Sequence, residues 1–198
     1  LHLLPHWNWQ EKEGEKIPVF CYTNYKEAEL FVNGQSQGRR KKNDESVFNR
    51  YRLMWKDVIY EPGTLKVVAY KENGERAAVE EIKTAASPYR IQLLPERSSI
   101  ANNGEDLSFI KAAVVDEAGN LCPRAHNKIN FSIEGPGEIM ATGNGDPTCT
   151  TAFTSKARKA FNGLCLLVVR SCKGRRGHIQ IKAEAEGLKK AEVMISSE

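Results

Sequence analysis

The 198-residue sequence predicts an all-β protein made of two tandem immunoglobulin-like β-sandwich domains. Short segments in which apolar and polar residues alternate recur at intervals of about 8 to 12 residues, as they do in β-sandwiches. Gly, Pro, Asn and Asp separate these segments, and no stretch keeps the apolar period of an amphipathic helix. The length suits two domains of about 100 residues, each large enough to bury a core.

A β-hairpin at Asn33-Gly34 is the clearest local prediction. The apolar run Glu29-Leu30-Phe31-Val32 enters this turn, and a second extended run leaves it. Asn and Gly both tolerate positive φ, so a two-residue type I′ turn here matches the twist of the flanking strands. The hairpin predicts structure only, because an Asn-Gly turn carries no chemistry.

Other extended segments complete the first domain. Trp55 lies in an apolar run, so we expect it in the core, and Pro62-Gly63 has the residues of a tight turn. The basic run at residues 39–42 is interpreted as a solvated loop. Besides the hairpin, the predicted strands are residues 17–23, 51–58, 65–70 and 76–84.

The run Ala85-Ala86-Ser87-Pro88 predicts the domain boundary, because small residues and a proline interrupt the periodic pattern there. We therefore expect domains at residues 1–86 and 87–198. Residues 157–161 could form one helical turn, which is too short to stand alone. The predicted strands of the second domain are residues 89–94, 107–116, 129–133, 164–169 and 179–185, followed by a last strand that carries Ala191, Val193 and Ile195.

Composition excludes several classes of function. The net charge is +4 and charges of both signs are spread along the chain, so nucleic-acid binding is not expected. No apolar run approaches the ~18 residues of a membrane span. The opening Leu1-His2-Leu3-Leu4-Pro5 lacks the basic start of a signal peptide and an initiator Met, so we expect a piece of a longer chain.

The five cysteines show no CxxC and no His/Cys ligand spacing, so neither a metal site nor a cofactor is expected. Their odd number leaves at least one free thiol within this chain, and the redox compartment stays undecided. Cys21 and Cys165 lie in apolar strand-like runs, where the role of a small buried hydrophobe is favoured.

Motifs of the first domain resemble those of glycoside hydrolase family 2, in its β-galactosidase-type members. The run Pro18-Val19-Phe20-Cys21-Tyr22-Thr23-Asn24, followed by Glu29 to Gly38, is similar to a signature of the sandwich domain that follows the catalytic barrel. The run His2-Leu3-Leu4-Pro5-His6-Trp7-Asn8-Trp9 resembles the segment by which these glycosidases leave the barrel. The order Trp55, then Tyr60-Glu61-Pro62-Gly63, then Leu65 to Tyr70 is also similar to the family pattern.

Motifs of the second domain resemble those of the C-terminal immunoglobulin-like domain of the same glycosidases. They are Asp106-Leu107-Ser108-Phe109, Val115-Asp116 with Gly119-Asn120, Gly135-Pro136-Gly137, Gly143-Asn144-Gly145-Asp146-Pro147 and Ala160-Phe161-Asn162-Gly163. The resemblance therefore covers almost the entire chain. One departure, Ala101-Asn102-Asn103-Gly104 in place of the family's Ala-Asp-Gly, puts only a loop in doubt.

The resemblance implies a non-catalytic C-terminal accessory region that packs against the catalytic barrel of the same polypeptide and supports carbohydrate metabolism. The family's two catalytic glutamates lie on that barrel. This sequence lacks the alternating strand–helix pattern of a barrel, so we expect no catalytic residue here and no activity of this chain alone. The resemblance further suggests a periplasmic or extracellular location, with carbohydrate or a second copy of the chain as additional partners.

Two other functions stay open. The first is a carbohydrate-binding module that uses exposed tryptophans as a stacking platform. The second, an adhesion-type immunoglobulin-like repeat, follows from the fold alone and is an analogy.

Two segments hold the candidate site residues. In an extended segment Trp7 and Trp9, which lie beside His6, would face the same way and could pack against the barrel or stack on a sugar; packing is favoured. Asn144 and Asp146 lie in a loop whose oxygens could contribute to a Ca²⁺ site, which needs about six to eight oxygen ligands. Two side chains fall short of that number, so a tight turn is the favoured interpretation.

Overall fold

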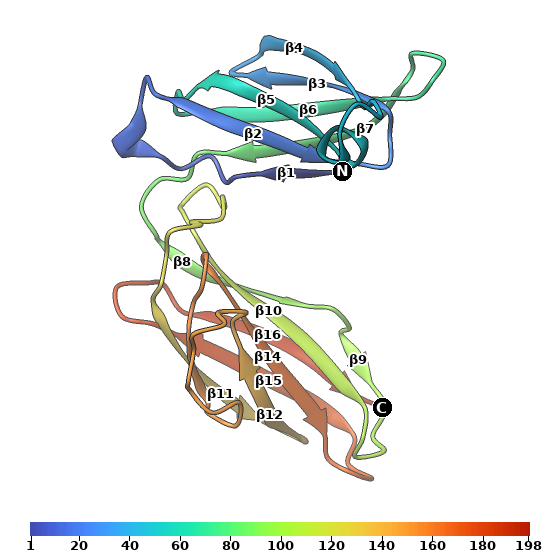
Figure 1. Cartoon of the computed structure of the whole chain (residues 1–198). Helices are drawn as coiled ribbons and strands as arrows, with labels where there is room; N and C mark the ends of the chain where they lie inside the picture. Colours follow the sequence, from blue (N-terminus) through green and yellow to red (C-terminus); the bar gives the residue numbers. More distant parts are fainter. The chain divides into compact units, whose positions relative to one another are not determined.

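The computed structural model describes all 198 residues and divides into two compact units, Leu1–Thr84 and Ala85–Glu198. Figure 1 shows that the regular secondary structure of each unit is almost entirely β-strand. Within each unit two sheets pack face to face over one apolar core. The predicted all-β fold class is confirmed. The structure contains no helix of the length and apolar character needed to cross a membrane.

The first unit packs a three-stranded sheet against a four-stranded sheet, and all pairs are antiparallel. The first sheet has the order β1 (His2–Leu4), β2 (Lys16–Tyr22), β5 (Arg52–Ile59); the second has the order β4 (Gln35–Lys41), β3 (Glu27–Val32), β6 (Thr64–Tyr70), β7 (Arg76–Lys83). Because successive strand residues point to opposite faces, Ile17, Val19 and Cys21 of β2 all enter the core. Trp55 is buried as predicted.

The hairpin at Asn33-Gly34 is confirmed. Val32 of β3 pairs with Gln35 of β4, and the two turn residues have φ of 49° and 82°. The Asn33 side chain also joins this turn to the turn before β6. Its Oδ1 accepts a hydrogen bond from the N–H of Thr64 at 2.8 Å, and its Nδ2 donates to the carbonyl of Pro62 at 3.2 Å. The Asn-Gly and Pro-Gly signals of the sequence therefore form one linked pair of turns.

Three features of the first unit differ from the sequence interpretation. The basic run Arg39-Arg40-Lys41 belongs to edge strand β4 and is exposed there, whereas a loop was expected. An edge strand tolerates such charges because its outer side faces water, and they discourage pairing with another chain. The short strand β1 and the helix α1 (Val47–Tyr51) were not expected, because neither is long enough to show a periodic pattern.

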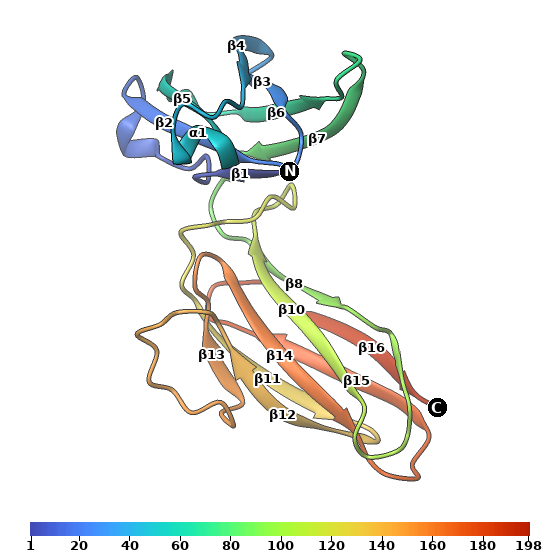
Figure 2. The same cartoon turned by 45° about the vertical axis from the view of Figure 1, so that its right-hand side comes forward.

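The second unit packs a four-stranded sheet against a five-stranded sheet, and Figure 2 shows the two layers. The first has the order β12 (Gly137–Gly143), β14 (Leu164–Ser171), β10 (Leu107–Val115), β8 (Arg90–Pro95); the second has the order β13 (Ala157–Lys159), β11 (Lys128–Glu134), β15 (Gly177–Glu184), β16 (Ala191–Ser197), β9 (Ser99–Ile100). All pairs are antiparallel except β9 with β16. The core includes Ile110, Phe131, Leu167 and Ile181.

Two expectations for the second unit need correction. Ala157–Lys159 forms strand β13 where one helical turn was considered, because this segment pairs with the edge of β11. Strand β12 was not expected. It begins and ends with glycine and carries a bulge between Ile139 and Ala141, so the sequence shows no clean alternation there.

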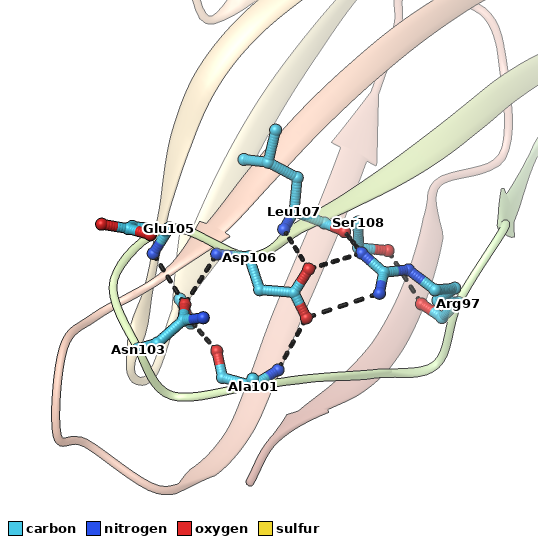
Figure 3. Close-up of polar contacts among 8 residues, drawn as sticks. Arg97, Ala101, Asn103, Glu105, Asp106, Leu107 and Ser108 are labelled. Atoms are coloured by element: carbon cyan, nitrogen blue, oxygen red, sulfur yellow. Dashed lines mark hydrogen bonds and ion pairs between the residues drawn. The ribbon is translucent and has the colours of Figure 1, made fainter.

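The loop before β10, where the sequence departs from the family pattern, is held by the polar contacts drawn in Figure 3. Asn103 Oδ1 accepts hydrogen bonds from the N–H groups of Glu105 and Asp106, both at 2.8 Å. Asp106 in turn accepts from Arg97 Nη2 at 2.7 Å and from the N–H of Ala101 at 2.8 Å. An asparagine can therefore serve in this loop as the turn acceptor.

Candidate docking surface

Trp7 is part of the core of the first unit. Its side chain is 0% exposed, and the ring lies edge-on to Tyr60 with 4.9 Å between the ring centroids. The indole Nε1 donates to the carbonyl of Glu61 at 2.9 Å, and the hydroxyl of Thr84 donates to the carbonyl of Trp7 at 2.6 Å. The ring thus has no face open to a ligand in this structure. Trp7 anchors the N-terminal segment to the residues just before β6 and just after β7.

His6 and Trp9 of the same segment are half-buried and contact each other, and Trp9 packs against the core of the first unit. Their rings stack with 4.4 Å between centroids, and the Lys12 ammonium lies 5.6 Å from the Trp9 centroid. Trp7 and Trp9 do not share one side of an extended strand, because β1 ends at Leu4 and η1 (Gln10–Lys12) follows directly after Trp9. Trp9 is thus the only one of the three tryptophans that is not buried.

Asn144 and Asp146 form a tight turn. Asn144 Oδ1 accepts from the N–H of Asp146 at 3.1 Å, and its Nδ2 donates to the carbonyl of Lys159 at 2.9 Å. Asp146 Oδ1 accepts from the hydroxyl of Thr148 at 2.7 Å and from its N–H at 2.9 Å, and these bonds lower the pKa of Asp146. The structure brings no group of three or more His, Cys, Asp or Glu side chains together in a metal-binding arrangement.

An aromatic surface that the sequence did not predict covers the outer side of the three-stranded sheet. We call it the aromatic face. Cross-strand pairing sets Leu4 opposite Phe20 and Tyr22 opposite Arg52, so these side chains are neighbours on one side of the sheet. The aromatic face consists of Leu4, Phe20, Tyr22, Phe48 and Arg52, and Tyr51 is exposed on the same short helical segment as Phe48.

Arg52 connects the sheet part of the aromatic face to α1. Its guanidinium carbon lies 4.7 Å from the ring centroid of Phe20 and 4.9 Å from that of Phe48. Its Nη1 donates to the hydroxyl of Tyr22 at 3.2 Å. A guanidinium between two rings is held by cation–π attraction, which keeps the aromatic side chains together at the surface.

The helix α1 displays its apolar side chains to solvent. Ser46 caps its N-terminus by accepting a hydrogen bond from the N–H of Asn49 at 3.1 Å. Val47, Phe48 and Tyr51 are 70%, 64% and 61% exposed, and no residue of the helix is buried. A helix on a sandwich ordinarily turns an apolar stripe inward. Here the large side chains add nothing to the core of the unit.

Basic residues border the aromatic face. A shallow pocket of about 360 Å³ lies next to it and is lined by Arg40, Lys41, Arg52 and Lys56, with Asn43 and Asn49. One acidic residue, Asp57, also lines the pocket and pairs with Lys16 at 2.9 Å. The rim is therefore positively charged and suits an acidic partner surface.

The sequence did contain a signal for this surface. In β2 the inward residues are Ile17, Val19 and Cys21, so Phe20 and Tyr22 occupy the outward positions where polar residues are usual. The apolar residues at 47, 48 and 51 lie in a charged stretch without periodicity. Large apolar residues at outward positions indicate a surface that something else covers.

The comparisons with known proteins identify the family. Residues 91–194 match the family described as glycoside hydrolase family 2 C-terminal domain 5, and residues 14–78 match a domain of unknown function (DUF4982). The β-galactosidase BoGH2A of Bacteroides ovatus is 44% identical over 199 residues, which cover 100% of this chain and 22% of that protein.

Two solved structures are similar throughout the chain. A glycosyl hydrolase family 2 member from Bacteroides cellulosilyticus has a TM-score of 0.85 at 34% identity and covers 98% of this chain. A β-glycosidase from Bacteroides vulgatus has a TM-score of 0.89 at 29% identity and also covers 98%. The chain spans 24% of each of these two proteins. The resemblance carried by the motifs is confirmed: the chain belongs to glycoside hydrolase family 2 and represents the C-terminal domain region of these enzymes.

Proposed function

We propose that this chain is the non-catalytic accessory region of a β-galactosidase-like glycoside hydrolase, and that its aromatic face docks on the catalytic domain of the same polypeptide. The similar proteins that carry glycosidase names are four to five times as long as this chain, which spans 22% or 24% of them. Both units are β-sandwiches, and neither has the alternating strands and helices of a catalytic barrel.

The observation that carries the proposal is the helix α1, which exposes Phe48 and Tyr51 and buries nothing. Burying an aromatic side chain of this kind stabilises a contact by roughly 2 kcal/mol. Left in water, the same side chains would favour association with other molecules. The basic rim formed by Arg40, Lys41 and Lys56 would steer the aromatic face toward an acidic area of its partner.

The test compares one double substitution in two contexts. Phe48→Ser with Tyr51→Ser should leave thermal unfolding of the 198-residue chain nearly unchanged, because both side chains are exposed there. In the whole glycosidase the same pair should lower the unfolding temperature and aryl β-galactoside turnover. The matched control is Val79→Ser, a change of another exposed apolar residue, on β7 of the other sheet. We expect no turnover by the 198-residue chain alone.

Two outcomes would contradict the docking proposal. One is an unchanged whole enzyme carrying the double substitution. The other is binding of galacto-oligosaccharides to the isolated chain that disappears with the double substitution, which would favour the carbohydrate-binding alternative. The sugar would then stack on the exposed Phe and Tyr side chains and not, as the carbohydrate-binding alternative assumed, on tryptophans.

A further inference from the structure

The second unit contains a buried arginine whose charge has no carboxylate partner. Arg158 of β13 is 2% exposed, and all five of its N–H groups donate hydrogen bonds. Four of them go to neutral oxygens: the hydroxyl and carbonyl of Thr142 and the carbonyls of Thr151 and Ala152, at 2.6 to 3.2 Å. The fifth, on Nη1, points at Cys149 Sγ at a distance of 3.2 Å.

A buried guanidinium without a counter-charge is unfavourable. Taking one unpaired charge out of water costs several kcal/mol, and hydrogen bonds to neutral groups offset only part of that. A guanidinium group stays charged in proteins, so this cost has to be met by its surroundings. Among the atoms that Arg158 contacts, Cys149 Sγ is the only one that can become an anion.

The surroundings of Cys149 favour the anionic form. The N–H and hydroxyl of Thr151 and the guanidinium of Arg158 all donate toward Sγ and lower the pKa of this thiol. Asp146, the acidic residue of the same loop, directs its carboxylate to Thr148 instead. Cys149 as a residue is partly exposed, whereas Cys21, Cys122 and Cys165 are buried.

We propose that Cys149 is held as a thiolate by Arg158, forming the counter-charge of the buried guanidinium, and that it is the site at which this chain reacts with small soft electrophiles. With a haloacetamide the sulfur lone pair attacks the methylene carbon, an S–C bond forms, and the halide leaves with the electron pair of the broken bond. No proton transfer is needed, because the attacking sulfur is already deprotonated. The thioether that results is neutral, so alkylation removes the counter-charge of Arg158.

The other cysteines provide internal comparisons. Burial raises the pKa of Cys21 and Cys122 to about 11 and that of Cys165 to about 12, although Arg158 lies close enough to Cys165 to oppose this rise. These three thiols are protonated and covered, so they should react slowly. Cys172 is partly exposed, like Cys149, and has no guanidinium partner, so it controls for access.

The experiment measures alkylation of each cysteine of the 198-residue chain by iodoacetamide, resolved by peptide mass spectrometry from about pH 6 to pH 8.5, with glutathione as a free-thiol reference. Near pH 6.5 we expect Cys149 to react about tenfold faster than Cys172. Its rate should change less than about threefold over this range, whereas that of glutathione rises by roughly two orders of magnitude. Arg158→Met should slow Cys149 near pH 6.5 about tenfold and restore a steep pH dependence.

A second variant and a second readout keep the test decisive. If Arg158→Met fails to fold, Thr151→Val removes one donor to the sulfur and should steepen the pH dependence of Cys149 with the arginine in place. Thiolate absorbance in the ultraviolet, taken as the difference between wild type and Cys149→Ser, reports ionisation regardless of access. A Cys149 rate that rises with pH as steeply as that of glutathione would overturn the proposal. So would an absorbance difference that vanishes near pH 7.

Discussion

At the scale of single residues, the buried carboxylate of Asp116 shows how hydrogen bonds outweigh desolvation. Asp116 is 2% exposed, and burial by itself raises the pKa of its carboxyl group. Its oxygens accept from the N–H of Asn120 at 2.7 Å, from Asn120 Nδ2 at 3.0 Å and from the N–H of Ala86 at 2.9 Å. The net result is a pKa below the usual value of 3.8. A turn was predicted here, but strand patterns do not reveal that the carboxylate is buried.

We therefore predict that Asp116→Asn destabilises the second unit by about 2 kcal/mol at neutral pH, because a donor replaces one acceptor beside buried N–H groups. The folded-state pKa is depressed, so the stabilising contribution is present above the unfolded-state pKa of about 3.9 and is lost as the pH falls through the folded-state pKa. The difference in the free energy of unfolding between wild type and variant should accordingly become smaller below about pH 4. Chemical denaturation at several pH values measures this.

The neighbouring residue provides the control. Glu117 follows Asp116 directly but is exposed, so Glu117→Gln should change the stability by less than about 0.5 kcal/mol. If Asp116→Asn and Glu117→Gln lowered the stability equally, the loss would be due to the change in net charge. The buried hydrogen bonds of Asp116 would then not explain it.

Burial of individual residues was predictable only inside strands. Cys21, Cys165 and Trp55 lie in apolar strand-like runs, and all three are buried as predicted. Trp7 precedes the first predicted strand, where no period indicates an inward side. The core position of Trp7 depends on its contacts with Tyr60, Glu61 and Thr84, more than fifty residues away in the sequence. Such long-range contacts leave no local signal.

At the scale of elements, the turns at Asn33-Gly34 and Pro62-Gly63 of the first unit are coupled through the Asn33 side chain. The Asn33 side chain fills the space beside Gly63, where an added Cβ would lie 2.0 Å from Asn33 Oδ1 at φ of 137°. We predict that Gly63→Ala destabilises the first unit by about 3 kcal/mol, since the backbone strain and the clash add. Gly74→Ala is the matched control, because Gly74 also has positive φ, 85°, but has no atom within 4 Å of its Cβ position. It should cost about 1 kcal/mol.

A double-mutant cycle isolates the clash. Asn33→Gly keeps a residue that accepts positive φ and removes the side chain that meets residue 63. In the Asn33→Gly background Gly63→Ala should therefore cost about as little as Gly74→Ala. Urea denaturation of the four proteins measures the coupling, and additive effects would contradict the linkage of the two turns.

Most strands could be predicted from the sequence because one side of each strand is buried. Apolar residues therefore recur at every second position along the strand. This holds for β2, β11 and β15, whose inward positions are apolar. The exceptions lack that alternation. Strand β12 carries glycine at both ends and a bulge, and α1 has five residues, all unburied. For the same reason the aromatic face was not predicted, since its residues occupy outward positions and a short helix.

At the scale of the whole molecule, family membership could be read from ordered motifs in both halves, whereas the aromatic face could be recognised only from the cross-strand register. The two apolar cores share no residue. On one side of the junction the N–H of Thr84 donates to the carbonyl of Gly63, at 2.8 Å. On the other side the N–H of Ala86 donates to Asp116. The backbone thus passes from the hydrogen bonds of one unit to those of the next within two residues.

We therefore propose that the two units are independent folding domains, and that residues 1–84 and 85–198 fold when produced separately. In calorimetry of the 198-residue chain, Gly63→Ala should lower only the transition of the first unit, and Asp116→Asn only that of the second. For domains of this size about 1 kcal/mol corresponds to a shift of roughly 4 to 8 °C, so either shift would be resolved. Each separate fragment should unfold within about 3 °C of its own transition in the whole chain, because each keeps its complete core. A single transition that both substitutions move together, or fragments without cooperative unfolding, would show instead that the units stabilise each other.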